Sequence, residues 1–410
     1  MRRIIVFVWV LCVVVSFSAK GNRVGDESKQ FTIIGEIKGL VPGDTLSFEK
    51  VILPYYGEGN EKAFQVIVSE PDRFVYSGSH PHTQYYSMTY KPLVGKWRGH
   101  SKVALPMIVD EGELRITGVT EHIYYCRLSS RLYDEPLLKE MLQLEDSVGM
   151  IRAEYGKIID EAREAGDMER AKEYTDKFNF FSRDHQETYT VLKQKKAELM
   201  EKNPYSQWMI VDLLQTVFYT PLEKLTAYIE NMEPEAAASF YGSLLKQEVE
   251  TMTKLAPGND APDFTVTTVD GKRITSANLR GKYVLFYRWG LCPGSIMIDI
   301  QITEFYEKYK EHLILIGMTD DIESIRQLNE TTKEEDELMG IKLKPVFENM
   351  AAHPWPEVEL KGDNHQITVD FAFAGLPYFV LLSPEGKILA RDFHEAYGKA
   401  KEIISAAFPD

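Results

Sequence analysis

The sequence predicts a chain of three folded parts: a β-rich, sandwich-like domain, an α-helical connector and a C-terminal α/β domain. Three observations predict this order. Short alternating segments separated by Gly, Pro and Asp fill residues 29–127. Apolar residues at helical spacing dominate residues 128–256. A compact apolar run followed by a cysteine and a proline lies within residues 257–410 and predicts a buried strand that leads into a helix.

Composition limits the function classes. The chain has 410 residues, of which 44% are hydrophobic and 27% charged, as in ordinary globular proteins. A formal net charge of -15 argues against a nucleic-acid partner, because phosphate binding needs a basic face. Only three cysteines are present, which excludes a disulfide-stapled scaffold. We expect no metal and no flavin or nucleotide cofactor.

Residues 1–19 have the pattern of a signal peptide. Arg2 and Arg3 precede an apolar run at residues 4–15, which is too short for a confident membrane span. Cleavage would remove Cys12 and leave two cysteines in the mature chain. The sequence therefore predicts an exported protein of the periplasm or cell envelope, in an oxidising compartment, with any membrane association peripheral.

The β-rich domain at residues 29–127 is predicted from seven strand candidates, which suggest a sandwich or an open barrel. They are residues 31–40, 46–52, 63–69, 74–77, 84–90, 103–109 and 113–116. His80 and His82 lie between two of them, but a metal site needs three or four ligands, so we interpret them as a surface pair. Cys126 closes the domain, either as an inert buried thiol or as a resolving thiol for Cys292. The second role requires the two Cα atoms to approach within about 7 Å.

The helical connector at residues 128–256 contains two apolar seams spaced three and four residues apart. The first seam comprises Met141, Leu144, Val148, Ile151, Tyr155, Ile158 and Ala162, and the second Ala171, Tyr174, Phe178, Phe181, His185, Thr188, Leu192 and Leu199. Gly166 and Asp167 separate them, which predicts an antiparallel helical hairpin. We expect His185 to be a packed residue of the seam and the segment to act in docking rather than catalysis.

The central feature of the last domain is a cysteine at the start of a helix. The apolar run Tyr283–Tyr287 leads through Gly290 to Cys292 and then to Pro293, which suits the first turn of a helix. Free backbone N–H groups and the helix dipole favour negative charge there, so the thiol should ionise more easily and become nucleophilic. The plain alternative is a small buried cysteine that only fills the core.

At these residues the chain resembles a known family. The segments APDFTVTTVDGKRITSANLRGKYVLFY, Cys292-Pro293-Gly294-Ser295 and GLPYFVLLSPEGKIL resemble the thioredoxin-fold domain of TlpA/ResA-type envelope thiol-disulfide oxidoreductases, which overlaps the AhpC/TSA redoxin profile. The resemblance covers residues 261–410 and implies a thioredoxin-like fold, with Pro377 as a cis-proline opposite the active cysteine. The region before it resembles a β domain of unknown function that precedes thioredoxin domains in exported proteins.

Ser295 departs from the family, because it stands where the second cysteine of Cys-x-x-Cys belongs. A serine can donate a hydrogen bond to the Cys292 thiolate, but it cannot resolve a mixed disulfide. The resemblance therefore implies a monothiol thiol-disulfide oxidoreductase that acts on protein thiols or disulfides of the envelope and needs an external thiol. We expect Cys292, Ser295 and Pro377 to be its catalytic residues.

Other residues near the cysteine are predicted to bind or admit substrate. We assign substrate binding to Leu376, Trp289 and Pro293, and expect Arg288 or Trp289 to shape the entrance. The loop at residues 353–356, with the sequence His-Pro-Trp-Pro, should line the mouth of the site. A peroxidase is rejected, since peroxiredoxins have Thr three residues before the cysteine and this chain has Trp289.

Two other functions stay open at this point. Loss of the resolving cysteine also suits a non-catalytic thioredoxin-fold module that binds a protein or peptide. Alternatively, Cys292 is a permanent attachment point for a partner cysteine. The reactivity of Cys292 towards alkylating reagents separates the first two possibilities, and non-reducing electrophoresis would reveal the third.

Overall fold

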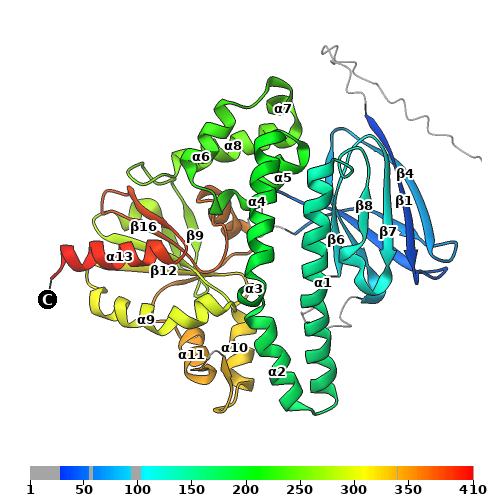
Figure 1. Cartoon of the computed structure of the whole chain (residues 1–410). Helices are drawn as coiled ribbons and strands as arrows, with labels where there is room; N and C mark the ends of the chain where they lie inside the picture. The colour runs from blue at the N-terminus through cyan, green and yellow to red at the C-terminus, as the bar shows by residue number, and fades with distance from the viewer. Residues whose placement is uncertain (1–27, 55–58, 94–102, 339, 410) are drawn as a thin grey trace, which may run out of the picture.

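The computed structural model describes residues 28–54, 59–93, 103–338 and 340–409 (Figure 1). The predicted signal peptide, residues 1–19, lies outside the described residues. In Figure 1 the helical segment lies between the β sheets, on one side, and the C-terminal α/β part, on the other. Among the described helices, none combines the length and the apolar character that a membrane crossing requires.

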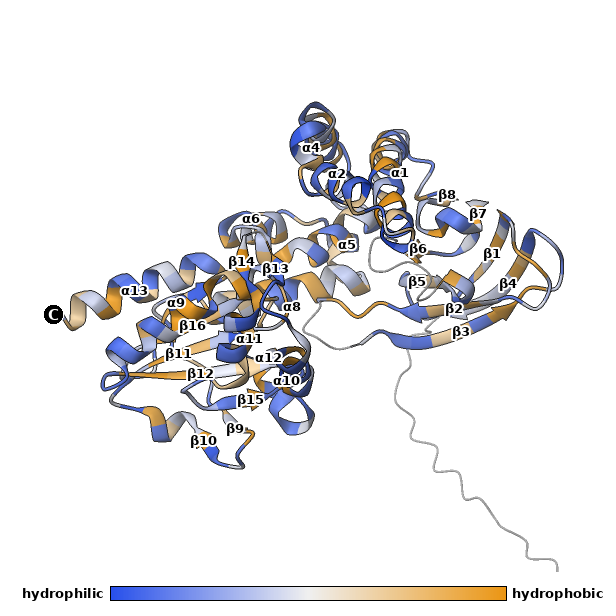
Figure 2. Ribbon diagram, turned by 90° about the horizontal axis from the view of Figure 1, so that it is seen from below, coloured by the Kyte–Doolittle hydropathy of each residue, from blue (hydrophilic) through white to orange (hydrophobic). Residues whose placement is uncertain are grey.

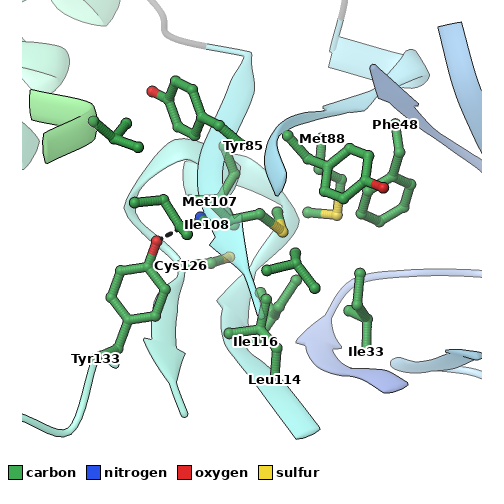
Figure 3. Close-up of a cluster of buried hydrophobic side chains, with 14 of the residues drawn as sticks. Ile33, Phe48, Tyr85, Met88, Met107, Ile108, Leu114, Ile116, Cys126 and Tyr133 are labelled. Carbon is green, nitrogen blue, oxygen red and sulfur yellow. Dashed lines mark hydrogen bonds between the residues drawn. The ribbon is translucent and has the colours of Figure 1, made fainter. Parts of the chain in front are cut away.

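The N-terminal part consists of two four-stranded sheets. One has the order β4 (Arg73–His80), β1 (Lys29–Lys38), β7 (Gly112–Val119), β8 (Arg127–Ser129), and the other β3 (Glu61–Ile67), β2 (Thr45–Lys50), β5 (Gln84–Tyr90), β6 (Ala104–Val109). Strands β1 and β7 are parallel, and the other neighbours are antiparallel. Alternate side chains enter a shared core, where Ile33 and Ile116 of the first sheet lie near Phe48 and Met88 of the second (Figure 3).

The helical segment begins with α1 (Pro136–Glu164), which packs along both α2 (Met168–Asn179) and α4 (Gln186–Lys202). The predicted break at Gly166 is present, with φ of +76°. A second interruption, around the short α3 (Phe181–Asp184), was not predicted; there the His185 ring stacks on Phe181 at 4.0 Å. The remaining helices are α5 (Gln207–Thr216), α6 (Leu222–Glu230), α7 (Pro234–Ala238) and α8 (Phe240–Lys254).

The helical segment shares a hydrophobic core with the two sheets. The Tyr241 hydroxyl of α8 accepts the Tyr85 backbone N–H of β5 at 2.6 Å. The His82 ring stacks on Phe240 at 3.7 Å, and His80 is buried against Phe31. The interpretation of the two histidines as a surface pair is therefore wrong for His80, whose pKa is lowered by burial. The segment is an integral part of the N-terminal core.

The C-terminal part has a five-stranded sheet of order β15 (Glu357–Glu359), β12 (Leu313–Thr319), β11 (Tyr283–Arg288), β16 (Tyr378–Leu382), β17 (Ile388–Asp392). Strands β11, β12 and β15 are parallel, whereas β16 and β17 are antiparallel to their neighbours. The parallel pair β11 and β12 is joined by α9 (Pro293–Tyr309), and α13 (His394–Ala407) follows the β16–β17 hairpin. The C-terminal part is therefore an α/β domain, as predicted, and its strand order agrees with the thioredoxin-like fold that the resemblance implied.

Both faces of this sheet are covered, which explains the continuous apolar run of β11. Leu285 and Tyr287 enter the cluster formed with α9, α11 (Leu343–Ala351) and α13. Val284 and Phe286 enter the opposite cluster, which includes α12 (Gln366–Asp370). Figure 2 shows that β11 is largely hydrophobic, in contrast to the hydrophilic α2 and α4. Three further pieces complete this part of the chain. They are the hairpin of β9 (Thr265–Thr267) and β10 (Arg273–Thr275), helix α10 (Ile322–Thr331), and the short strand pair β13 (Glu337–Leu338) and β14 (Ile341–Lys342).

Candidate functional site

Cys292 is the N-cap residue of α9, and its side chain is partly exposed. The Cys292 Sγ accepts the Ser295 backbone N–H at 3.3 Å and lies 3.2 Å from the Ser295 Oγ. Pro293 occupies the first helical position, where a residue without an N–H fits. A thiolate at this place would be stabilised by the N-terminal end of the helix and by two hydrogen-bond donors.

The loop before β16 lies against the start of α9. The Leu376–Pro377 peptide bond is cis. A Cβ atom added to Gly294 would lie 2.9 Å from the Pro377 Cδ, and one added to Gly290 would lie 2.8 Å from the Leu376 Cδ1. Only glycine leaves room for this close approach, so the turn before α9 and the proline loop form one site.

Exposed apolar side chains occur close to Cys292 in the sequence. Leu291 and Met297 are 45% and 49% exposed, on either side of the cysteine in the sequence. Phe393 packs beside Gly375, and its ring stacks on Tyr219 of the helical segment at 5.2 Å. The helical segment thus contributes an exposed aromatic ring near the proline loop. Apolar surface of this kind suits a polypeptide partner.

Two residues predicted at the entrance lie inside the protein. Trp289 has no exposed surface, and its indole N–H donates to the Glu357 carboxylate at 3.1 Å. Arg288 is also buried and donates to the Phe373 carbonyl at 2.8 Å. The predicted contact of Trp289 with substrate is therefore wrong: β11 points alternate residues to opposite buried faces, and both side chains enter the core.

Two side chains of the loop at residues 353–356 point into the protein, whereas Pro354 is exposed. The His353 side chain is fully buried between two carboxylates, with its Nδ1 2.6 Å from the Glu357 Oε1 and its Nε2 3.0 Å from the Asp299 Oδ1. Trp355, also buried, donates its indole N–H to Glu357 at 2.7 Å. The polar atoms of His353 and Trp355 are thus bonded to Asp299 and Glu357 inside the core, and the position of this loop at the entrance stays a prediction.

The charges of this cluster depend on each other. Burial alone would lower the pKa of His353, but its hydrogen bonds with Asp299 and Glu357 outweigh burial and raise that pKa to about 9. Burial raises the pKa of Glu357, and the hydrogen bonds from His353, Trp289 and Trp355 oppose that rise. The imidazole is therefore cationic at neutral pH and lies between the side chains of Asp299 and Glu357.

Asp299 joins this cluster to Tyr287 of β11. It lies on α9 with no exposed surface, and it accepts the Asn349 side-chain N–H at 2.6 Å and the Tyr287 hydroxyl at 3.3 Å. Sequence analysis missed these residues, although an Asp among the inward-facing residues of an apolar helix face was a usable signal.

Cys126 is buried in the N-terminal core beside Gly118. Burial raises the pKa of its thiol to about 12, so the thiol is protonated and unreactive at neutral pH. Both cysteines in the described part of the chain are free. A cavity of about 680 Å³ adjoins Cys126, Tyr85 and Trp208, and none of its lining residues belongs to the α/β part. The cavity is lined by aromatic, acidic and basic side chains, and its lining residues do not form a recognisable catalytic site.

Comparisons with known proteins gave matches to solved structures alone. No family model matches the chain, and no curated protein matches it. The thioredoxin domain of a thiol-disulfide oxidoreductase from Bacteroides vulgatus is 23% identical over 36% of this chain and 98% of that one, with a TM-score of 0.27. A putative protein disulfide isomerase from Bacteroides thetaiotaomicron is 23% identical over 38% and 91% of the two chains, with a TM-score of 0.28. A putative thiol:disulfide interchange protein DsbE from Chlorobium tepidum is 18% identical over 37% and 96%, with a TM-score of 0.28.

Proposed function

We propose that this protein is an exported, monothiol thiol-disulfide oxidoreductase that acts through Cys292. One observation carries the proposal: the partly exposed Cys292 sulfur lies at the N-terminus of α9 and accepts the Ser295 backbone N–H at 3.3 Å. The sulfur is free and partly exposed, and its thiolate is the nucleophilic form. In this proposal Ser295 contributes its N–H, and Leu376 and Pro377 form the opposite wall.

The chemistry requires two exchange steps. The Cys292 thiolate attacks one sulfur of a substrate disulfide, so that a new Sγ–S bond forms while the substrate S–S bond breaks. The second substrate sulfur leaves as a thiolate and takes a proton from solvent. An external dithiol then attacks the substrate sulfur of the mixed disulfide and releases Cys292 as a thiolate; its second thiol breaks the new mixed disulfide, so the substrate ends as two thiols and the dithiol as a disulfide. Alternatively, a different thiolate of the same substrate attacks that sulfur, which releases Cys292 and leaves the substrate with a rearranged disulfide.

The surface beside the sulfur favours protein disulfides as substrates. Leu291 and Met297 are about half exposed, and Leu376 is partly exposed on the facing loop. An extended, partly folded polypeptide can cover such apolar side chains, whereas a small disulfide such as glutathione disulfide covers little of them. The partner class is therefore a protein with an accessible disulfide.

Trapping the mixed disulfide tests the proposal. The mature full-length chain is incubated with glutathione disulfide or with a protein whose disulfides have been scrambled. The reaction is quenched with acid, and the products are analysed by non-reducing electrophoresis and peptide mass spectrometry. We expect an adduct on Cys292 that dithiothreitol removes. The Cys292→Ser variant should form none, whereas Cys126→Ala, the matched control, should form as much as the wild type.

The competing function is a thioredoxin-fold module that binds a protein without chemistry. It is favoured by one observation: in the described residues the other cysteine, Cys126, is buried in a different core from Cys292. If wild type and Cys292→Ser bind a disulfide protein equally well and neither forms an adduct, the binding module is correct and the oxidoreductase proposal is wrong.

A further inference from the structure

The short helix η3 (Val217–Tyr219) joins the helical segment to the α/β part of the protein. Val217 has no exposed surface and belongs to the N-terminal core. Phe218 packs against that core and also against the core on one face of the C-terminal sheet. Tyr219 then stacks on Phe393, with ring centroids 5.2 Å apart and ring planes 8° apart. Three consecutive residues therefore contact both parts, and the position of Tyr219 is determined from both sides.

Phe393, the stacking partner of Tyr219, packs on the loop that carries the cis proline. A Cβ atom added to Gly375 would lie 3.1 Å from the Phe393 Cε1, so the ring lies against the backbone two residues before Pro377. The Tyr378 ring meets Phe393 edge-on, with centroids 5.1 Å apart. Phe393 is thus held by the proline loop, and Tyr219 extends its aromatic surface towards the helical segment.

His394 continues from Phe393 to the cysteine. It is exposed and is the first residue of α13. A Cβ atom added to Gly294 would lie 3.2 Å from the His394 Nε2. Gly294 lies in the first turn of α9, whose N-cap residue is Cys292. A row of rings from Tyr219 through Phe393 to His394, which we call the aromatic row, therefore connects the helical segment with the first turn of α9.

Tyr219 remains 70% exposed, although one of its faces is stacked. Its neighbour Phe218 makes the contacts that join the two cores, so the Tyr219 ring is not needed inside the junction. A tyrosine ring that is already fixed in place loses little conformational entropy when a second apolar group covers its free face. For this reason such rings are common among the residues that contribute most to polypeptide binding.

We propose that Tyr219 is a specificity-determining residue for the polypeptide that reacts with Cys292. The polypeptide lies along the aromatic row and places an apolar side chain, preferably an aromatic one, on the free face of Tyr219. The occupant of this surface is the substrate, because the row is continuous with the first turn of α9. The N-terminal half of the protein thus takes part in substrate selection. This inference rests on the proposed function, since it takes a protein disulfide as the substrate.

A peptide series tests the inference on the mature full-length chain. Each peptide has one cysteine, present as its 2-thiopyridyl disulfide, in a sequence otherwise made of Ala, Ser and Gly. The Cys292 thiolate attacks the peptide sulfur, the S–S bond to the pyridyl group breaks, and the absorbance of the released 2-thiopyridone gives the rate. One phenylalanine is placed in turn at each position near the cysteine. For each position, the rate is divided by that of the peptide with alanine there.

We expect wild type to prefer phenylalanine at one position or at two neighbouring positions, by roughly two- to tenfold, which corresponds to one aromatic contact. In Tyr219→Ala this ratio should fall to about one, because the contact is lost. Each ratio is taken within one protein, so a general change in the reactivity of Cys292 cancels. Tyr219→Phe keeps the ring and should keep the preference.

Phe180→Ala is the matched control. Phe180 is a 49% exposed aromatic residue of the same helical segment, and the Arg183 guanidinium lies 4.4 Å over its ring. This variant should show the wild-type preference. A preference that survives in Tyr219→Ala, or that wild type lacks at every position, overturns the inference. Loss of the preference in Phe180→Ala overturns it too, because the effect would not belong to Tyr219.

Failure of the proposed function gives a different result. If the peptides react without any preference for phenylalanine, Cys292 chemistry stands and only the inference is wrong. If no peptide forms an adduct, the oxidoreductase proposal is wrong, and the role of Tyr219 is decided by binding alone. Fluorescein-labelled peptides with serine in place of cysteine are then titrated by fluorescence polarisation. Tighter binding of a phenylalanine peptide that disappears in Tyr219→Ala supports the inference, and equal binding of all peptides by wild type overturns it.

Discussion

The strongest stability prediction concerns the pH dependence that His353 imposes on the folded protein. The folded-state pKa of His353 is about 9, against about 6.5 for an unperturbed histidine. The folded protein therefore holds this proton more tightly than the unfolded chain. The stabilisation is fully present below pH 6.5 and is lost as the pH rises through 9.

The expected magnitude follows from the two pKa values. Each pH unit between them is worth about 1.4 kcal/mol, so the free energy of unfolding should fall by up to about 3 kcal/mol between pH 6.5 and 9. Burial also raises the pKa of Glu357, so the stability that this group contributes is lost as the pH rises above its ordinary value of 4.5. His80 does not contribute in this range: its pKa is lowered, so it destabilises the fold only as the pH falls below 6.5.

Urea denaturation at pH 6, 7, 8 and 9 measures this effect, with circular dichroism and indole fluorescence as two independent signals. The comparison variant is His353→Gln, which keeps a polar side chain but cannot titrate. We expect wild type to lose stability steadily over this range, and the variant to start lower and change little. Equal slopes in the two proteins, or a flat wild-type profile, would refute the proposed charge of His353.

Three further predictions concern packing and partners. Gly294→Ala places a methyl group 2.9 Å from the Pro377 Cδ, so it should destabilise the fold by about 1–3 kcal/mol and slow Cys292 alkylation; unchanged values would contradict the close approach. Met297→Glu should slow adduct formation with protein disulfides several-fold while leaving glutathione disulfide unaffected. Tyr241→Phe removes the acceptor of the buried Tyr85 N–H and should lower the unfolding free energy by about 1–3 kcal/mol in urea titrations; a smaller loss would mean that water replaces it.

The elements around the cysteine were predictable from local pattern. The apolar run of β11, Cys292 and the following Pro293 are adjacent in the sequence, and each favours the observed strand, turn and helix start. The hairpin of β16 and β17 was likewise indicated by its Pro-Glu-Gly turn. In these segments the residues that determine the structure are close neighbours in the chain.

What could not be predicted depends on contacts between distant residues. The Asp299–His353 pair joins residues 54 positions apart, and the Tyr85–Tyr241 hydrogen bond joins residues 156 apart. Periodicity cannot show that α8 completes the core of the β sheets, nor that Trp289 turns inward to Glu357 rather than outward to a substrate. Both outcomes are decided by tertiary packing, which the sequence pattern leaves open.

The serine three residues after Cys292 has a consequence for how fast the protein can work. The Ser295 oxygen lies 3.2 Å from the Cys292 sulfur. A sulfur atom in place of this oxygen would give the site a pair of neighbouring thiols that needs no external thiol to resolve a mixed disulfide. A dithiol pair completes its cycle at a rate fixed within the molecule. In the proposed monothiol oxidoreductase, the oxygen makes completion of the cycle a second-order event, so the supply of reducing thiols around the protein would govern its throughput.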